Sequence, residues 1–356
     1  MAYTTINKST DYFNTKLYTG DGTTSHAITG VGFEPSMVWC KNRDATNSHF
    51  ITDQVRGATK VIHPDTNQVE GTWTNGLISF DSDGFTQSNS GAGNENGQGI
   101  ASWNWLAGTA VSGNTGGSGT AKTYTGSVNT TSGFSIIKYT GNGTLGHTIP
   151  HHLGVAPSMM IIKITDGDTS DWYVYHKDLG NTGILFLSNT NAASNSNAYW
   201  NSTTPTSSVF TVGDQTGNNS NNNTFISYNF AEVPGFSKFG KYTGNGNVNG
   251  TFIYTGFKPS FILRKRTDDV GAWLMQDNKR PGSNRVVADS LPTDQNVLRA
   301  NETSAEEYNN ELDMLSNGFK LRADNSFGNS SGATYIYMAF AEAPLVGSNG
   351  VTAKAR

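Results

Sequence analysis

The sequence is poor in charged residues, and that shortage already excludes one class of partner. Charged residues make up 15% of the 356 residues, against about 25% in an average globular protein. The formal net charge is −4, so the chain lacks the basic field that binds a nucleic-acid backbone. We therefore expect no nucleic-acid partner.

Cysteine and long apolar runs are also scarce. The single cysteine, Cys40, excludes an intrachain disulfide framework and a thiolate metal cluster. No stretch approaches the about 18–20 consecutive apolar residues of a membrane-spanning helix. Residues 1–5 have neither the basic nor the apolar part of a secretory signal. We expect a protein made in the cytoplasm, without membrane insertion, and stabilised by apolar burial and strand pairing.

What is abundant is glycine together with small polar residues. Glycine provides 41 of the 356 residues, about 12% against an average of about 7%. Residues 172–175 and 184–187 are short runs of β-branched and aromatic residues, bounded by Gly, Asn, Asp or Pro. Asn-Gly and Asp-Gly pairs mark tight turns between such runs. The composition predicts an all-β protein.

The chain also repeats itself three times. Two anchors recur in step: a Tyr-Thr-Gly block at Tyr18, Tyr139 and Tyr242, and a Pro-Ser block at Pro35, Pro157 and Pro259. A third landmark is an aromatic run that ends each copy, at residues 100–105, 225–230 and 335–340. Each copy is long enough to bury a core, unlike the short repeats of solenoids.

We therefore expect three tandem antiparallel β-sandwich domains of jelly-roll or lectin-like type, at residues 1–125, 126–234 and 235–356, the last with a C-terminal tail. Each should hold seven to nine strands in two sheets, and the aromatic closing run should be a central strand buried on both faces. Gly, Ser and Thr predict a bendable joint at residues 108–130, and the joint at 234–235 should be tight. Residues 304–315 are the one segment with the pattern of a short helix.

Candidate catalytic positions do not agree between the copies. The aligned positions carry His49 and Asp53, then Trp172 and His176, then Trp273 and Asp277. We interpret the aromatic residues as packing or stacking positions. No nucleophile or cofactor motif is present, so we expect no catalytic residue and no cofactor. A carboxylate pair, as in a polysaccharide depolymerase, stays an alternative because the distance between two such groups depends on the fold.

Metal sites are weakly indicated. His147, His151 and His152 form the one histidine cluster, in a Gly/Pro-rich segment without the ligand spacing of a known site, and we expect turn and surface histidines there. Residues 165–171 offer carboxylate oxygens but lack the EF-hand pattern, so we expect a polar turn. Calcium binding by residues 166–171 stays open. We predict no metal.

Charged segments are read as structural. Residues 264–266 (Arg-Lys-Arg) should form a solvated strand end that Asp268 and Asp269 neutralise. Glu232 and Glu342 should each end a strand before a proline.

Aromatic residues are the remaining candidates for a binding site. The chain has 7 tryptophans and 14 tyrosines among many Asn and Ser residues, as on surfaces where rings stack on sugars and amides bind hydroxyls. Most should be core. Trp73 and Trp200 stand in polar surroundings, so we expect them to be the exposed ligand-binding residues.

Several repeated blocks resemble a known family. The blocks at residues 237–246, 252–259 and 335–344, including Lys-Tyr-Thr-Gly-Asn-Gly, are similar to tandem-repeat virion structural proteins, described as tail-fibre-like, of tailed bacteriophages of marine bacteria. The resemblance covers residues 12–356 and brings no defined functional residues with it. It implies a non-enzymatic protein on the particle surface that binds other virion proteins of the tail or capsid.

From the resemblance and the composition together we expect recognition of a host-surface glycan, with assembly as a homo-oligomer, a trimer in the case of a fibre. The first repeat diverges most and is expected to anchor to the particle. Two alternatives stay open: a capsid decoration or head-fibre protein that stabilises the shell, and a polysaccharide depolymerase.

Overall fold

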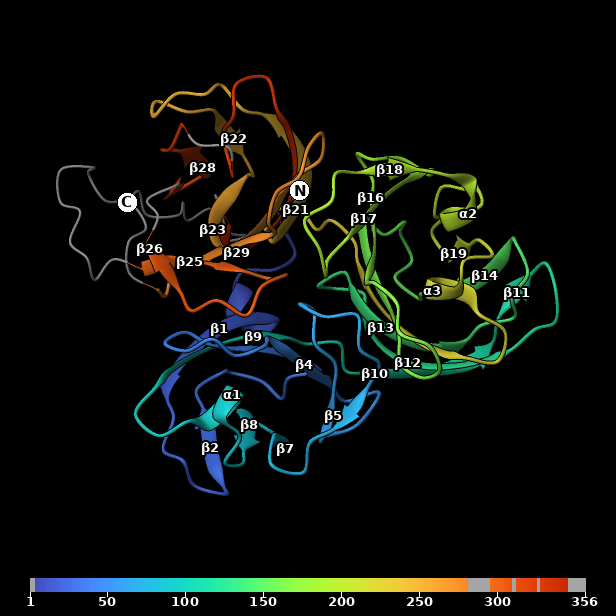
Figure 1. Ribbon diagram of the computed structural model, residues 1–356, viewed down its shortest axis with the longest axis horizontal. Helices are drawn as coiled ribbons and strands as arrows, with labels where there is room; N and C mark the ends of the chain where they lie inside the picture. The colour runs from blue at the N-terminus through green and yellow to red at the C-terminus, as the bar shows by residue number, and fades with distance from the viewer. Residues whose placement is uncertain (1–3, 281–294, 309–311, 325–326, 345–356) are drawn as a thin grey trace.

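The computed structural model describes residues 4–280, 295–308, 312–324 and 327–344. In this part of the chain nearly every regular element is a strand, and the paired strands are antiparallel. The three copies of the repeat form three lobes around a common centre (Figure 1). We call them the first, second and third unit.

The first unit contains η1 (Ser9–Asp11), β1 (Phe13–Thr19), β2 (His26–Thr29), β3 (Met37–Asn42), β4 (Phe50–Asp53), β5 (Lys60–Val61), β6 (Gly71–Thr72), β7 (Leu77–Asp81), β8 (Gly84–Gln87), α1 (Gly91–Asn94) and β9 (Gly99–Trp105). Its larger sheet has the order β1-β9-β3-β4, and a smaller sheet, β2-β8-β7, lies on the outer side.

The second unit contains β10 (Thr109–Asn114), β11 (Gly116–Gly117), β12 (Thr123–Asn129), β13 (Phe134–Thr140), β14 (His147–Pro150), β15 (Met159–Ile164), β16 (Tyr173–His176), β17 (Gly183–Phe186), β18 (Ser194–Asn195), α2 (Asn197–Trp200), β19 (Val209–Val212), α3 (Thr216–Asn219) and β20 (Thr224–Phe230). Its sheets have the orders β10-β12-β13-β20-β15-β16-β17-β18 and β11-β14-β19.

The third unit contains β21 (Ser237–Thr243), β22 (Phe252–Tyr254), β23 (Phe257–Arg266), β24 (Leu274–Asp277), β25 (Gln295–Arg299), β26 (Glu307–Tyr308), β27 (Leu312–Leu315), β28 (Gly318–Leu321) and β29 (Thr334–Pro344). Its sheets have the orders β21-β29-β23-β24-β25-β26 and β22-β28-β27.

The aromatic closing run of each unit is a central strand, as predicted. β9 lies between β1 and β3, β20 between β13 and β15, and β29 between β21 and β23. All residues of β9 and β20 after the first are buried. Burial on both faces explains why these strands are rich in apolar and aromatic residues. Their polar residues, Ser102, Asn104, Ser227 and Asn229, are buried as well.

The inner faces of the three larger sheets share one hydrophobic core, which the sequence analysis did not predict. A single cluster of buried residues takes side chains from all three units. At its centre the last aromatic residue of each closing run meets the other two. Ring centroids are 6.2 Å apart for Trp105 and Phe230, 6.0 Å for Phe230 and Phe340, and 5.8 Å for Trp105 and Phe340. This near-equilateral triangle marks a pseudo-threefold axis.

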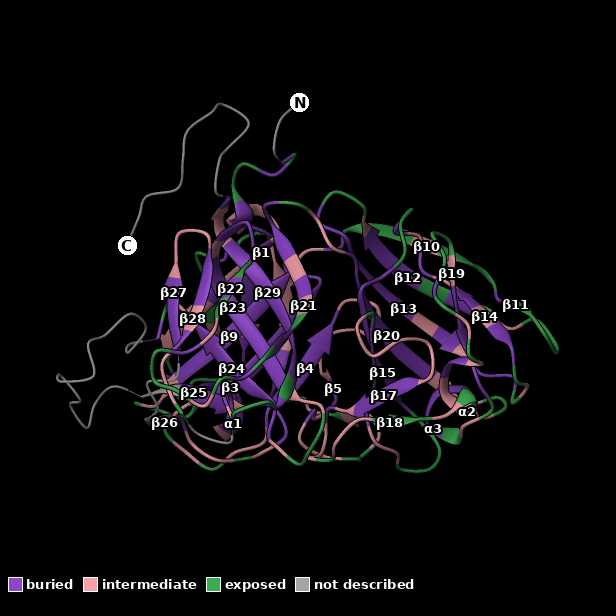
Figure 2. Ribbon diagram, turned by 90° about the horizontal axis from the view of Figure 1, so that it is seen from above, coloured by how far each residue is buried: buried purple, intermediate pink, exposed green. Residues whose placement is uncertain are grey.

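Each unit also has a core of its own between its larger and smaller sheets. The larger sheets are therefore buried on both faces, and exposed residues gather on the outer loops and on the edge around β10 and β11 (Figure 2). The molecule is a ring of three sandwiches. Each sandwich has its own outer core between its two sheets, and the three larger sheets enclose one shared core at the centre.

Four local predictions are wrong. The Gly/Ser/Thr-rich segment 108–130 is not a bendable joint, because it forms β10, β11 and β12, which extend the sheets of the second unit. With them the described part of that unit has eleven strands, above the seven to nine expected. The boundary expected at residue 125 lies within β12.

The described part of residues 304–315 forms β26 and β27 instead of a helix. Leu312 and Met314 both enter the third unit's own core, between its two sheets, a spacing of two that belongs to a strand. The glutamates that suggested helix reflect ion pairing, since Glu306 is buried against Arg280 and Arg43.

Candidate functional site

Buried ionisable side chains gather at the joints between units. At the first–second joint the Asp53 carboxylate accepts hydrogen bonds from Arg56 Nε at 2.6 Å and from the Tyr228 hydroxyl of the second unit at 2.7 Å. Arg56 also pairs with Glu70 at 3.3 Å. The side chains of Asp53 and Arg56 are fully buried.

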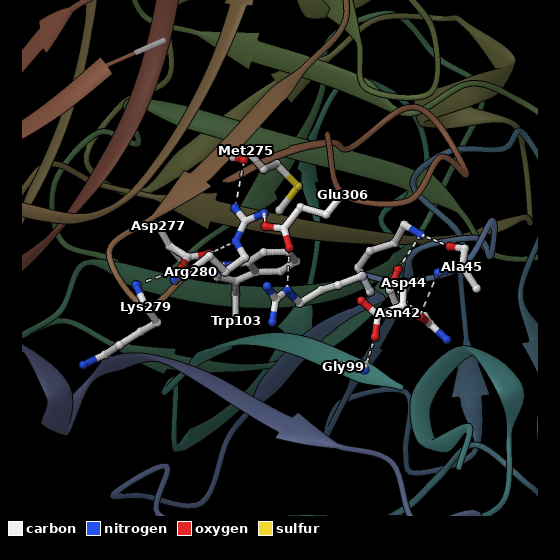
Figure 3. Close-up of polar contacts among 12 residues, drawn as sticks. Asn42, Asp44, Ala45, Gly99, Trp103, Met275, Asp277, Lys279, Arg280 and Glu306 are labelled. Atoms are coloured by element: carbon white, nitrogen blue, oxygen red, sulfur yellow. Dashed lines mark hydrogen bonds and ion pairs between the residues drawn. The ribbon is translucent and has the colours of Figure 1, made fainter. Parts of the chain in front are cut away.

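The third–first joint repeats this arrangement (Figure 3). Asp277 accepts from Arg280 Nε at 2.7 Å and from Trp103 Nε1 of the first unit at 3.1 Å. Glu306 accepts from Arg280 Nη1 at 2.8 Å and from Arg43 Nε of the first unit at 2.7 Å. Trp103 and Tyr228 hold the same place in their closing runs, so the two joints are related by the pseudo-threefold axis.

At the second–third joint the equivalent position is uncharged. His176 stands where the other units have Asp53 and Asp277, and its Nε2 lies 3.3 Å from the carbonyl oxygen of Tyr337 in the third unit. Burial lowers the pKa of His176 to about 4, so the ring is neutral and donates from Nε2 while Nδ1 accepts from the Asp178 amide. Two joints therefore place an Asp–Arg pair at this position, and the third places a neutral histidine there.

A buried lysine also stands at the same place in each unit, six residues after the repeated proline. Lys41, Lys163 and Lys265 are at most 1% exposed. Each ammonium donates to a backbone carbonyl of its own unit and to one of a neighbouring unit. The neighbouring carbonyls are those of Thr303 for Lys41 at 3.1 Å, Asn67 for Lys163 at 3.1 Å and Thr190 for Lys265 at 3.3 Å.

These joint residues are structural. In each charged joint a guanidinium lies between the two carboxylates, so neither pair can share a proton or hold a water molecule as a glycosidase pair does. Removing one member of such a pair strongly destabilises the folded protein, because the other member is left buried and unpaired. The lysine ammonium groups replace water as donors to loop carbonyls.

The two tryptophans predicted to be exposed differ from the prediction. Trp200 is 1% exposed, and its Nε1 donates to the Gly183 carbonyl at 2.9 Å, so the expectation of an exposed Trp200 is wrong. It forms part of the second unit's own core, between its two sheets. Trp73 is half-buried and packs on Phe50 and His63, with ring centroids 5.9 Å and 4.9 Å away.

The histidine cluster does not consist of turn and surface residues. His147 and His151 are fully buried. His147 hydrogen-bonds to Asn219 at 2.9 Å and Thr115 at 2.6 Å, and burial lowers the pKa of His151 to about 4. His152 is paired separately with the Tyr124 hydroxyl at 2.8 Å. The sequence analysis missed these core positions because polar partners far along the chain satisfy them.

The carboxylates of the acidic loop, residues 165–171, bind separate partners. Asp166 accepts from the Thr224 amide at 2.7 Å, whereas Asp171 accepts from the Ser188 hydroxyl at 2.8 Å. Within the described residues no group of three or more His, Cys, Asp or Glu side chains is placed to hold a metal ion.

The remaining charged candidates form ion pairs. Arg266 pairs with Asp268 at 3.0 Å and Asp269 at 3.5 Å, as expected, but Arg264 is buried like Lys265, so the segment is no solvated strand end. Glu232 pairs with two lysines, and Glu342 pairs with Lys258 at 2.8 Å.

An exposed aromatic surface lies on the third unit, and the sequence analysis did not single it out. Phe252 is 43% and Tyr254 54% exposed, while Ile253 between them is buried. Their alternate positions put both side chains on the outer face of β22, with Cα atoms about 6.4–6.8 Å apart along the strand. Lys320 on β28 lies directly opposite Phe252. We call Phe252, Tyr254 and Lys320 the aromatic face.

An asparagine-rich loop, residues 245–249, leads into β22 next to this face. Asn245, Asn247 and Asn249 are exposed, and their side chains fold the loop through bonds such as Asn245 Nδ2 to the Asn249 carbonyl at 3.1 Å. The Asn245 amide is thus used within the fold, and the exposed Asn247 and Asn249 are the residues of this loop whose amides can meet hydroxyl groups near the two rings.

The other units show that the rings are not needed for folding. The buried residue of the equivalent strand is isoleucine in all three units and pairs with a phenylalanine: Ile28 with Phe85, Ile149 with Phe210 and Ile253 with Phe319. The outward positions carry Ala27 and Thr29 in the first unit and Thr148 and Pro150 in the second. Comparison of aligned outward positions would have found this signal in the sequence.

Comparisons with known proteins give one family. The family described as Domain of unknown function (DUF7483) matches residues 8–344, so it spans all three units together. No curated protein and no solved structure shows significant similarity to the chain. None of the helices in the described residues is long and apolar enough to cross a membrane.

Proposed function

The chain belongs to the DUF7483 family, whose description assigns no activity, and from that premise we propose that it is a non-enzymatic protein of a phage particle surface that recognises a host-surface glycan. The single observation that carries the glycan part of the proposal is the aromatic face. Two rings exposed on one side of a strand, where the sister units have small residues, are suited to stacking on sugar rings.

The surroundings support a saccharide over an apolar partner. The exposed loop amides of Asn247 and Asn249 offer hydrogen bonds for hydroxyl groups, and Lys320 beside Phe252 adds a cation for an acidic sugar. An apolar protein interface would instead favour a larger continuous apolar area around the rings.

The virion part of the proposal rests on the resemblance of the repeated blocks to tail-fibre-like proteins. The shared core supports it, since a rigid body without a separable domain suits a particle that leaves the cell. Electron cryomicroscopy of intact particles tests it. Copies in small multiples of three or six at the tail support recognition, and hundreds of copies on the icosahedral lattice would instead make the chain a decoration protein.

Glycan binding is tested on an array of bacterial surface polysaccharides with the full chain. We expect Phe252→Ala and Tyr254→Ala each to weaken the strongest interaction about three- to tenfold, equivalent to about 0.7–1.4 kcal/mol. Because both side chains are exposed, the free energy of unfolding should stay within about 0.5 kcal/mol of the parent value.

The matched control is Val270→Ala, which truncates another apolar side chain, 63% exposed, away from β22. It should leave binding unchanged. Equal losses for Val270→Ala and Tyr254→Ala, or full binding by the Phe252→Ala/Tyr254→Ala double variant, would remove the aromatic face from the proposal.

A further inference from the structure

We propose that the free edge of β1, in the first unit, is a docking site for an extended acidic strand of another polypeptide. The inference concerns a protein partner and does not depend on the glycan proposal. It rests on a comparison of three equivalent strands within the chain: β1, β13 and β21, aligned by their Tyr-Thr-Gly ends at Tyr18, Tyr139 and Tyr242.

The second unit shows the docked form of this edge. There β12 pairs antiparallel with β13 along its whole length, from Tyr124 opposite Tyr139 to Asn129 opposite Phe134. β10 then pairs with β12. The fold of the repeat therefore accepts an added antiparallel strand at this edge without disturbing the central strand beside it.

In the first unit the same backbone groups have no partner among the described residues. The Leu106 amide donates to the Tyr12 carbonyl and the Gly20 amide to the Gln98 carbonyl, so the even-numbered residues of β1 face β9. Backbone groups of the alternate residues point to the outer edge, and these are Phe13, Thr15, Leu17 and Thr19. Within the described residues no backbone partner lies on their outer side.

In the third unit, nearby residues of the same polypeptide protect the equivalent edge of β21. The Phe239 amide faces the Glu232 carboxylate at 3.5 Å, the Ser237 amide donates to the Val233 carbonyl, and the Thr243 carbonyl accepts from the Thr251 hydroxyl at 2.9 Å. Unprotected edges invite pairing with other chains, and proteins usually block them. Of the three equivalent edges, that of β1 is the one left bare within the described residues.

An open groove runs along this bare edge. Residues 14–17 of β1 line it together with Gly30 and with Lys279 of the third unit. At the first–second joint the place of Lys279 is taken by Val55, which packs against the shared core. The groove thus has lysines, Lys16 and Lys279, where the strand-filled joint has apolar packing.

The two lysines specify the charge of the partner. Lys16 stands where β13 has Ile137, and Ile137 lies opposite Gly126 of β12. A strand docked as β12 is docked would therefore place one side chain directly opposite Lys16. A carboxylate there forms a favourable cross-strand pair, and a lysine there is repelled. Main-chain bonds supply the affinity and the lysines supply the selectivity.

The test uses two synthetic peptides that copy residues 123–129 of β12, one with Gly126→Glu and one with Gly126→Lys. Each is added at millimolar concentration to the full chain, and amide hydrogen exchange is followed by NMR. We expect the Glu peptide to slow exchange at Thr15, Leu17 and Thr19, and to bind at least about threefold more tightly than the Lys peptide.

A blocking variant makes the site specific. Leu17→Pro removes one outward amide of β1 without touching a bond to β9 and should abolish the protection. Lys241→Pro, the aligned change on the protected edge of β21, should leave it intact. No protection with either peptide, equal protection with both, or protection that survives Leu17→Pro overturns the proposal.

Discussion

At the scale of single residues, the three buried lysines show how polar chemistry holds the units together. Burial is the main cause that lowers the pKa of Lys41, Lys163 and Lys265 from 10.5 to about 8. In the unfolded chain each lysine keeps its ordinary pKa. Between pH 8 and 10.5 the unfolded state therefore binds more protons than the folded one, and stability rises with pH in that window.

We predict that the free energy of unfolding increases from about pH 8 to about pH 10, by up to about 1.4 kcal/mol per pH unit for each lysine. Above about pH 10 buried tyrosines reverse the trend, since burial raises the pKa of Tyr139 and they ionise first in the unfolded chain. Urea titrations across this range measure the slope. Lys163→Met should remove about a third of it, and Lys241→Met, at an exposed lysine, should not.

An unchanged slope in Lys163→Met would show that this lysine is not the titrating group.

The same residue scale explains why the sequence could not identify the buried tryptophan. Trp200 stands among Asn and Ser, but the polar neighbours cap a short helix, with Ser196 accepting from the Ala198 amide. Local composition does not report which way a side chain turns from such a helix.

At the scale of elements, β1 distinguishes inward from outward positions along an edge strand. Lys16 uses its backbone groups toward β9, whereas those of Leu17 point outward. Proline removes an amide donor and is tolerated at an edge where that amide faces solvent.

We predict that Lys16→Pro destabilises the protein by about 3 kcal/mol or more, while Leu17→Pro costs much less. Thermal or urea unfolding of the two variants measures the difference. Similar losses for both would contradict the assignment of outward groups on which the docking proposal depends.

Local sequence pattern predicted the central strands correctly, because the aromatic closing runs belong to strands that are buried on both faces. It misassigned residues 304–315, where capping residues and glutamates outweighed the alternation of Leu312 and Met314. Glu306 is explained by Arg280 and Arg43, which lie far away in the chain. A local pattern does not reveal such partners, and this limit also hid the roles of His147 and the aligned lysines.

At the scale of the whole molecule, the shared core makes the three units interdependent. Trp105, Phe230 and Phe340 bury each other, and each unit alone would expose its part of this cluster to water. The repeat was readable from the sequence because its anchors are local. The closed arrangement of the three units could not be predicted from the sequence. The residues on the inner face of each larger sheet are apolar whether that face packs on a helix, a loop or another copy of the repeat.

We predict one cooperative thermal transition for the full chain, with a calorimetric enthalpy equal to the van't Hoff enthalpy. Independent sandwiches would instead give separate transitions or a ratio well above one. The excised second unit, residues 109–234, is expected to lack dispersed methyl resonances in NMR spectra. A folded, monomeric segment would show that the second unit is stable without the shared core.

The pseudo-threefold ring built from one chain has a consequence for how surfaces can diverge. Three identical subunits around a true axis would display every surface feature three times, at equal angles. Joining the units covalently lifts that constraint: the first keeps a bare strand edge, the second adds the β10–β12 hairpin and the third carries exposed rings. The ring therefore carries a different surface feature on each lobe. A partner that binds one lobe also determines the direction in which the other two lobes point.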